Sequence, residues 1–305
     1  MQTTHPQQLK ATYIGNMAFA SLSTEQEGFV LGSTSKGIFI KTSGKWINFI
    51  STEPFRGPLT ITLPNTAQSL PRITPQSPVQ ISSRTLNFPA AGVEISTQNS
   101  IVWQSPLPFG RPLPESKRKE RLNNSARKIL FVKKGTGLTS LIPLLLELPD
   151  SQHPTSQSRS SLDRNILLLH EWMQRTTQLP TTNSVISLSG AGEGLTPSGD
   201  DFIIGLLLAL KRWGNVLLPG RDLQTLTKTV VDAAYKKTTM LSANLIECAS
   251  LGQADERLIA SLDWLMSDVP QVSNCLDELL DWGNSSGGDV FVGFTVALSL
   301  HKELI

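Results

Sequence analysis

The chain has 305 residues, of which 39% are hydrophobic, and its formal net charge is +2. This length suffices for one large domain or two ordinary domains with real hydrophobic cores. A charge so near neutral argues against a nucleic-acid-binding protein, which needs a concentrated basic surface.

Nothing in the sequence predicts a membrane or secreted protein. The longest apolar runs, 141–148 and 202–210, fall short of the roughly 20 residues that span a bilayer. The N-terminus has no charged-then-apolar secretion signal. The two cysteines, Cys248 and Cys275, make no disulfide framework. We therefore expect a cytoplasmic protein without a membrane partner.

The first hundred residues predict short strands. Residues 59–63 alternate with period two, as a half-buried strand does. Other short β-favouring runs, separated by Gly and Ser, cover 28–32, 37–41, 46–50, 79–81 and 101–103. Regular short strands with Gly and Pro turns are typical of a small barrel or sandwich. The Pro-rich segment 64–78 predicts a long loop.

Four prolines between 106 and 114 mark a boundary, beyond which the apolar period becomes helical. The pattern predicts helices over 115–130, 138–148, 161–177, 198–213, 221–251, 254–267, 271–282 and 286–302. We expect an exposed loop over 150–160 and a short extended segment over 183–189. The sequence thus predicts an α+β fold, with a β-rich domain over 1–114 and an α-helical domain over 115–305.

The most informative segment is Gly190–Asp201, with the sequence GAGEGLTPSGDD. Its alternating glycines favour a loop with positive φ, and an apolar helix follows. Ser198 can act as the N-cap, with Asp201 completing a capping box. Asp200 is then left without a structural task, which favours a role in binding a ligand or Mg²⁺. The alternative is that both acids only cap and solvate a helix end.

A second segment, Gly283–Asp289, repeats this pattern ahead of another apolar helix. Six identical pairs align at one constant offset: Ser198/Ser286, Gly199/Gly287, Asp201/Asp289, Gly205/Gly293, Ala209/Ala297 and Leu210/Leu298. We infer two buried helices that cross at their small residues, with glycine-rich beginnings that converge on one anion site. The alternative is two ordinary core helices that face different directions.

Three further residues are candidates for an anion site. Thr238 is four residues from Ser242, on one face of the predicted helix, although such hydroxyls also bond to the preceding turn. Thr239 lies between them. Arg56 sits in a predicted turn, where it is either simply solvated or recognises a carboxylate or phosphate. The four histidines have no zinc-site spacing.

The segment Leu188–Phe202 resembles the signature of the bacterial DUF2877 family. Ser285–Asp289 is similar to its second motif, and Phe55–Pro58 to a short N-terminal one. Some members of this family resemble a subunit of oxamate carbamoyltransferase, which exchanges a carbamoyl group between oxalurate and phosphate in anaerobic allantoin breakdown. The resemblance implies a carbamoyl-transferring, multi-subunit enzyme of purine catabolism.

Together these features define a hypothetical site. Asp200 and Asp201 are the candidate catalytic residues, and Asp200 is the candidate Mg²⁺ ligand. The candidate substrate-binding residues are Gly192, Gly194, Thr196, Ser198, Gly199, Ser285, Ser286, Gly287, Gly288, Asp289, Thr238, Thr239 and Arg56. The expected partners are a small anionic metabolite and other protein subunits. The alternative function is that of a non-catalytic metabolite-binding or assembly subunit.

Overall fold

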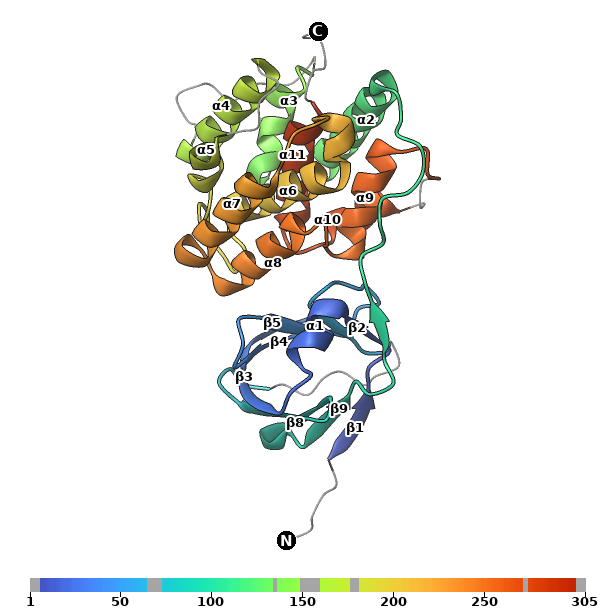
Figure 1. Ribbon diagram of the computed structural model, residues 1–305, viewed down its shortest axis with the longest axis vertical. Helices are drawn as coiled ribbons and strands as arrows, with labels where there is room; N and C mark the ends of the chain where they lie inside the picture. Colours follow the sequence, from blue (N-terminus) through green and yellow to red (C-terminus); the bar gives the residue numbers. More distant parts are fainter. Residues whose placement is uncertain are drawn as a thin grey trace. The chain divides into compact units, whose positions relative to one another are not determined.

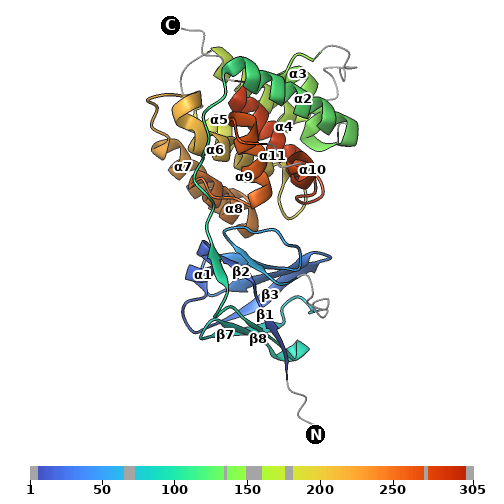
Figure 2. The same cartoon turned by 90° about the vertical axis from the view of Figure 1, so that its right-hand side faces the viewer.

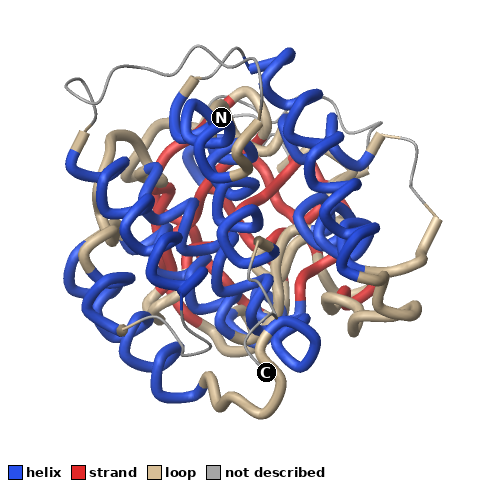
Figure 3. The backbone as a smooth tube through the Cα atoms, turned by 90° about the horizontal axis from the view of Figure 1, so that it is seen from above, coloured by secondary structure: helices blue, strands red, loops and turns tan. Residues whose placement is uncertain are grey.

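The computed structural model describes residues 6–64, 73–133, 136–148, 160–175, 181–270 and 274–299. The chain divides into two compact units, Met1–Pro106 and Leu107–Ile305. The named strands belong to the first unit, and every named helix except α1 and η1 belongs to the second (Figure 1, Figure 3). The α+β class predicted from the sequence is confirmed.

The described part of the first unit forms one ten-stranded sheet, with the order β1-β9-β8-β7-β3-β4-β5-β6-β2-β10. Its strands are β1 (Gln7–Lys10), β2 (Tyr13–Gly15), β3 (Gln26–Thr34), β4 (Gly37–Thr42), β5 (Ile47–Ser51), β6 (Thr60–Thr62), β7 (Pro78–Ser82), β8 (Thr85–Phe88), β9 (Val93–Ser96) and β10 (Ile101–Trp103). Most neighbouring strands run antiparallel, while β5/β6, β1/β9 and β2/β10 are parallel.

The sheet curls so that its two ends meet through the chain itself. β1 lies at one end of the order, and β2, only two residues later, lies next to the other end. Two backbone hydrogen bonds continue the pairing across this junction, from Ala11 N to Ser96 O (2.9 Å) and from Ile101 N to Thr12 O (3.0 Å). The result is barrel-like rather than a two-sheet sandwich, and one apolar cluster that includes Val30, Ile40 and Ile61 fills it.

The runs predicted to be strands from period and β-propensity are strands in the structure. Sequence patterning missed β1, β2, β8 and β9, which are short and partly polar, and also the short helices α1 (Asn16–Ser21) and η1 (Pro89–Ala91). Residues 65–72 of the predicted loop lie outside the described residues.

The second unit is helical. Its elements are α2 (Glu115–Lys133), η2 (Gly137–Leu141), α3 (Ile142–Leu145), α4 (Ser161–Arg175), α5 (Thr182–Ile186), α6 (Ser198–Leu217), α7 (Gln224–Lys237), α8 (Met240–Ser250), α9 (Glu256–Met266), α10 (Cys275–Leu280) and α11 (Ser286–Leu298). Of the described helices, none has both the length and the apolar character that crossing a bilayer requires.

Helices α6 and α11 lie in the middle of this unit, with the other helices around them (Figure 1, Figure 2). Every residue of α11 is buried, as are residues 199–210 of α6. A Cβ atom at Gly205 would lie 2.1 Å from the carbonyl oxygen of Val290, and one at Gly293 would lie 2.3 Å from that of Phe202. The two backbones therefore cross in contact at their glycines, as the repeated small residues predicted.

The reciprocal contact has the form of a local two-fold relation. Phe202 and Val290 occupy the same place in the two repeated segments, as do Gly205 and Gly293. Each glycine meets the carbonyl of the equivalent residue on the other helix. The repeat in sequence thus corresponds to a repeat in packing.

Three predicted segments differ from the structure. The segment 221–251 is split into α7 and α8, because residues 238 and 239 adopt extended backbone. The segment 183–189, predicted to be extended, contains α5. The segment 138–148 is a 3-10 turn followed by one short helix. Most of the predicted loop 150–160, 271–273 and residues 300–302 lie outside the described residues.

Candidate functional site at the beginnings of α6 and α11

The first turns of α6 and α11 lie next to each other. The hydroxyl oxygens of Thr196 and Ser286 are 3.1 Å apart and share a hydrogen bond. Ser286 is the first residue of α11, and Thr196 lies two residues before the start of α6. The expectation that the two beginnings converge is therefore confirmed, and the alternative in which they face different directions is wrong.

The predicted capping box at α6 does not form. The N-cap position is occupied by Pro197, and no side chain caps the helix there. Ser198 is the first helical residue, so its hydroxyl is not placed to accept from the next turn. The capping role that the sequence predicted for Asp201 is therefore wrong.

Asp200, which the sequence left without a structural task, is the acid that organises the loop. Its carboxyl group is buried and accepts hydrogen bonds from Gly190 N (2.8 Å), the Ser189 hydroxyl (3.5 Å) and the Thr238 hydroxyl. Burial raises the pKa of Asp200, and these donors partly offset the effect. Asp200 therefore ties the glycine-rich loop to the break between α7 and α8.

Asp201 has the opposite environment. Its side chain is 0% exposed, and neither carboxyl oxygen has a hydrogen-bond partner among the described residues. Burial, joined by the negative charge of Asp289, raises the pKa of Asp201 well above its usual range. The hydroxyls of Ser286 and Thr196 lower it in part, although neither reaches normal hydrogen-bond geometry with the carboxyl group.

Asp289 is the equivalent of Asp201 on α11. It is also 0% exposed, and one of its oxygens accepts a 2.8 Å hydrogen bond from Leu138 N. The other oxygen has no partner in the described chain. Burial raises the pKa of Asp289, against the opposing effect of Leu138 N and then of the Ser198 hydroxyl. Each helix thus places one incompletely paired carboxyl group in the first turn.

The second helix has no equivalent of Asp200 for a steric reason. Gly288 occupies that position, and a Cβ atom there would lie 2.7 Å from the Thr139 methyl carbon. A side chain at this position would therefore require the methyl group of Thr139, in η2, to move.

Several amides predicted to hold an anion already donate within the chain. Gly199 N donates to Ala191 O (2.8 Å), Gly287 N to Trp282 O (2.9 Å) and Gly288 N to Ser285 O (2.9 Å). These three groups serve the local fold, so the expectation that they line an anion cradle has to be corrected.

Other amides remain as donors. Gly192 and Gly194 are exposed, with φ of 116° and 96°. Their N–H groups, like those of Ser198 and Ser286 in the first helical turns, have no acceptor among the described residues. The first N–H groups of a helix lack intrahelical partners and suit a bound anion.

Thr238 and Ser242 were predicted to lie on one face of a single helix, which is wrong, because the chain breaks between α7 and α8 and only Ser242 is helical. Thr239 caps α8 by accepting from Ser242 N (3.1 Å), and its hydroxyl donates to Leu195 O (2.8 Å). Thr238 donates to Asp200. Both threonines hold the glycine-rich loop, which no local sequence signal revealed.

Replacing Thr238 with valine is expected to lower the free energy of unfolding by about 1.5–3 kcal/mol, the usual range for a hydrogen bond to a charged group. The substitution keeps the side-chain shape but removes a donor to the buried Asp200 carboxylate. Thermal unfolding measures the effect. Thr229→Val is the matched control, because Thr229 is exposed and bonds only to Thr225 O. Equal changes in the two variants would contradict this role.

Two other candidates are placed as follows. Ser285 is half-buried and precedes α11 without a side-chain capping bond.

Arg56 belongs to the first unit, where its guanidinium carbon lies 5.1 Å from the centre of the Tyr13 ring. The neighbouring carbonyl oxygens of Gly57 and Pro58 pack against Gly15, where an added Cβ would lie within 2.3 Å of both. This turn therefore has a packing role in the first unit.

The described residues contain no group of three or more His, Cys, Asp or Glu side chains that could hold a metal ion. Both oxygens of Asp200, the candidate Mg²⁺ ligand, accept hydrogen bonds from the protein. The donor set at Asp200 is therefore that of a structural carboxylate.

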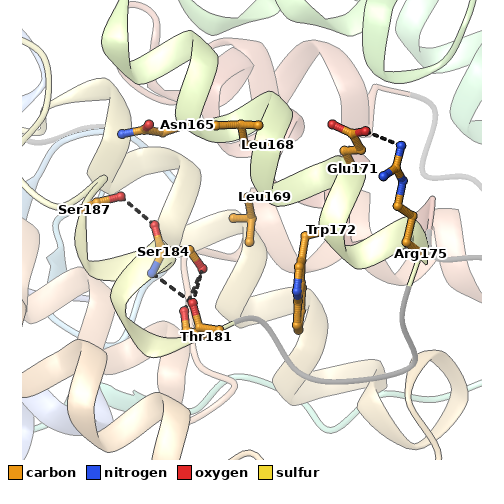
Figure 4. Close-up of a pocket in the computed structure, with 9 residues that line it drawn as sticks. All are labelled: Asn165, Leu168, Leu169, Glu171, Trp172, Arg175, Thr181, Ser184 and Ser187. Carbon is orange, nitrogen blue, oxygen red and sulfur yellow. Dashed lines mark hydrogen bonds and ion pairs between the residues drawn. The ribbon is translucent and has the colours of Figure 1, made fainter.

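A separate pocket lies between α4 and α5, with a cavity volume of about 560 Å³. Figure 4 shows Leu169 and Trp172 of α4 on the side of Ser184 of α5 and of Thr181, which precedes that helix, with the Glu171–Arg175 ion pair at one side. None of the residues proposed from the sequence lines it. The apolar pattern of α4 is that of an ordinary amphipathic helix, so no local pattern predicted this pocket.

Comparison with known proteins bears on the helical unit. No solved structure matches the chain. The family model described as oxamate carbamoyltransferase subunit AllH matches residues 188–298. This region begins just before the glycine-rich loop and ends with α11, so it contains both repeated segments. Over these residues, the chain is similar to a subunit of a carbamoyltransferase.

Proposed function

We propose that this chain is a subunit of a carbamoyl-transferring enzyme and binds a small carboxylate- or phosphate-bearing ligand where α6 and α11 begin. The observation that carries the proposal is the hydrogen bond between Thr196 and Ser286, which joins the two helix beginnings. The similarity of residues 188–298 to an oxamate carbamoyltransferase subunit supports the reaction class.

The arrangement offers two kinds of group to such a ligand. Donors come from the N–H groups of Ser198 and Ser286 and from the exposed amides of Gly192 and Gly194. Acceptors come from the incompletely paired acids of the first turns. Transfer of a carbamoyl group depends mainly on positioning and on stabilising developing charge, so this set requires no strong nucleophile.

Asp201 is the better candidate for proton transfer than Asp200. The oxygens of Asp200 are occupied by donors from the loop and from Thr238, whereas those of Asp201 are not. A carboxyl group whose pKa is raised by burial can exchange protons nearer to neutral pH. We therefore assign the general acid–base role to Asp201 and a loop-holding role to Asp200.

The test is an enzyme assay with oxalurate and phosphate as substrates, in which the products carbamoyl phosphate and oxamate are measured. The purified chain is assayed alone and together with the subunits that co-purify with it. Thr196→Val is expected to lower turnover at least about tenfold, because it removes one of the two joined hydroxyls. The exposed Thr229→Val variant serves as control. Equal turnover in the two variants would count against the proposed site.

A non-catalytic subunit is the second candidate. It is favoured by the internal hydrogen bonds of the Gly199, Gly287 and Gly288 amides, which give these helix beginnings a structural role. If this alternative holds, the turnover rate of the complex stays the same when Thr196 and Asp201 are replaced. The chain would then contribute ligand binding or assembly only.

A further inference from the structure

Two buried carboxyl groups face the junction of α6 and α11 with free acceptor oxygens. Both oxygens of Asp201 and one oxygen of Asp289 lack a partner among the described residues, and both side chains are 0% exposed. Buried polar atoms without partners are rare in folded proteins, because water no longer satisfies them. Three such oxygens in the first turns of two touching helices point to a missing donor.

The orientation of these groups follows from their neighbours. Asp201 on α6 is influenced by the Ser286 hydroxyl on α11, and Asp289 on α11 by the Ser198 hydroxyl on α6. The negative charges of the two acids also act on each other. Each carboxyl group therefore faces the opposite helix, and both face the same junction.

Four hydroxyl groups act on these acids, those of Ser286 and Thr196 on Asp201 and those of Ser198 and Ser285 on Asp289. None of them makes a hydrogen bond to the unpartnered carboxyl oxygens. A ligand with its own N–H or O–H groups would supply the donors that these oxygens lack.

A ligand can reach the junction from the glycine-rich loop. Residues 192–195 are exposed, and Thr196 and Ser198, which follow them, are half-buried. The same side carries the unpaired N–H group of Ser198. One end of the junction thus offers hydrogen-bond donors and the other offers acceptors.

We propose that Asp201 and Asp289 bind the –NH₂ group of a primary amide or carbamoyl ligand, while the Ser198 and Ser286 N–H groups hold its carboxylate. This inference rests on the proposed function and adds the residues that select the ligand. A primary amide has two N–H donors, which match acceptors supplied by two different helices. A ligand of the same shape without these donors leaves the carboxyl groups unsatisfied.

The experiment compares oxamate with pyruvate, in which a methyl group replaces –NH₂. Titration calorimetry of the full chain is expected to show at least about tenfold tighter binding of oxamate, the discrimination expected from one to two good hydrogen bonds. In Asp201→Asn, the preference should fall close to one, because an amide at this position supplies fewer acceptors. The exposed Asp232→Asn variant should keep the preference of the unmodified chain.

The outcomes separate this inference from the proposed function. Equal binding of oxamate and pyruvate, or a preference that survives in Asp201→Asn, overturns the role of the two acids but leaves a carboxylate site in place. Binding of neither ligand overturns both proposals. Circular dichroism of each variant establishes that it is folded before its affinity is compared.

Discussion

Replacing Gly205 with alanine is expected to destabilise the helical unit by more than about 3 kcal/mol, at the upper end of the cost of overpacking a core. The added Cβ would lie 2.1 Å from the Val290 carbonyl oxygen and 3.2 Å from the Gly293 Cα atom. Backbone cannot move aside as a flexible side chain can, so α6 and α11 would have to separate. For a unit of this size, we expect the melting temperature to fall by roughly 6–12 °C.

The same helix provides a matched control. Gly214 is also within α6, but the nearest atom to a Cβ there is the end of the Leu223 side chain, at 3.2 Å. Gly214→Ala should leave stability unchanged or raise it by up to about 1 kcal/mol, because alanine favours the helix. Gly293→Ala should repeat the large loss, since its Cβ would meet the Phe202 carbonyl oxygen at 2.3 Å. Similar melting temperatures for all three variants would refute the close crossing.

Asp201→Asn is expected to stabilise the protein at pH 7.5 by about 1–3 kcal/mol while impairing ligand binding. The substitution removes a buried carboxyl group whose oxygens have no hydrogen-bond partner among the described residues, and it introduces an –NH₂ donor close to Ser286 and Asp289. Residues that cost stability in this way are typical of functional sites.

The pH dependence of this gain has a defined sign. The unfolded chain ionises Asp201 near its ordinary pKa of 3.8, whereas burial raises the pKa in the folded state. Between the two values the folded state binds more protons, so stability is full below about 3.8 and falls as pH rises through the folded pKa. The free energy of unfolding that Asp201→Asn gains over the unmodified chain should therefore grow from pH 4 to pH 7.5, as measured by denaturant titration.

The neighbouring acid is the control for this prediction. Asp200→Asn should bring no gain in stability, because an amide cannot accept hydrogen bonds from both Gly190 N and the Thr238 hydroxyl as the carboxylate does. A gain at Asp200 as large as that at Asp201 would show that burial alone, rather than the lack of partners, sets the cost.

The sequence predicted those features that depend on residues close together in the chain. Period-two alternation in 59–63 and the apolar run after Asp201 located elements correctly. The repeat of Gly205 and Gly293 even predicted a long-range contact, because a glycine required for packing on one helix needs a partner on the other. Short polar strands such as β1 gave no signal, since their neighbours in the sheet determine their structure.

The sequence rules also assigned a hydrogen-bond partner to the wrong one of the two adjacent acids, for a similar reason. Capping rules consider only partners within a few residues, and by those rules Asp201 had a partner and Asp200 did not. The actual donors to Asp200 are Gly190 and Thr238, which lie 10 and 38 residues away. The break between α7 and α8 that brings Thr238 into place was itself not predicted. Site chemistry here depends on tertiary contacts that local patterns do not encode.

The way in which the first unit closes constrains its synthesis. The strands over residues 7–15 pair with those over 93–103, so residues 7–15 find these neighbours only after most of the unit has been translated. Such long-range pairing makes folding slow, and it leaves β8 without β9 and β2 without β10 until residues 93–103 have been translated. A nascent chain stalled before residue 93 would expose those strand edges, and chaperone binding during translation should be strongest over that interval.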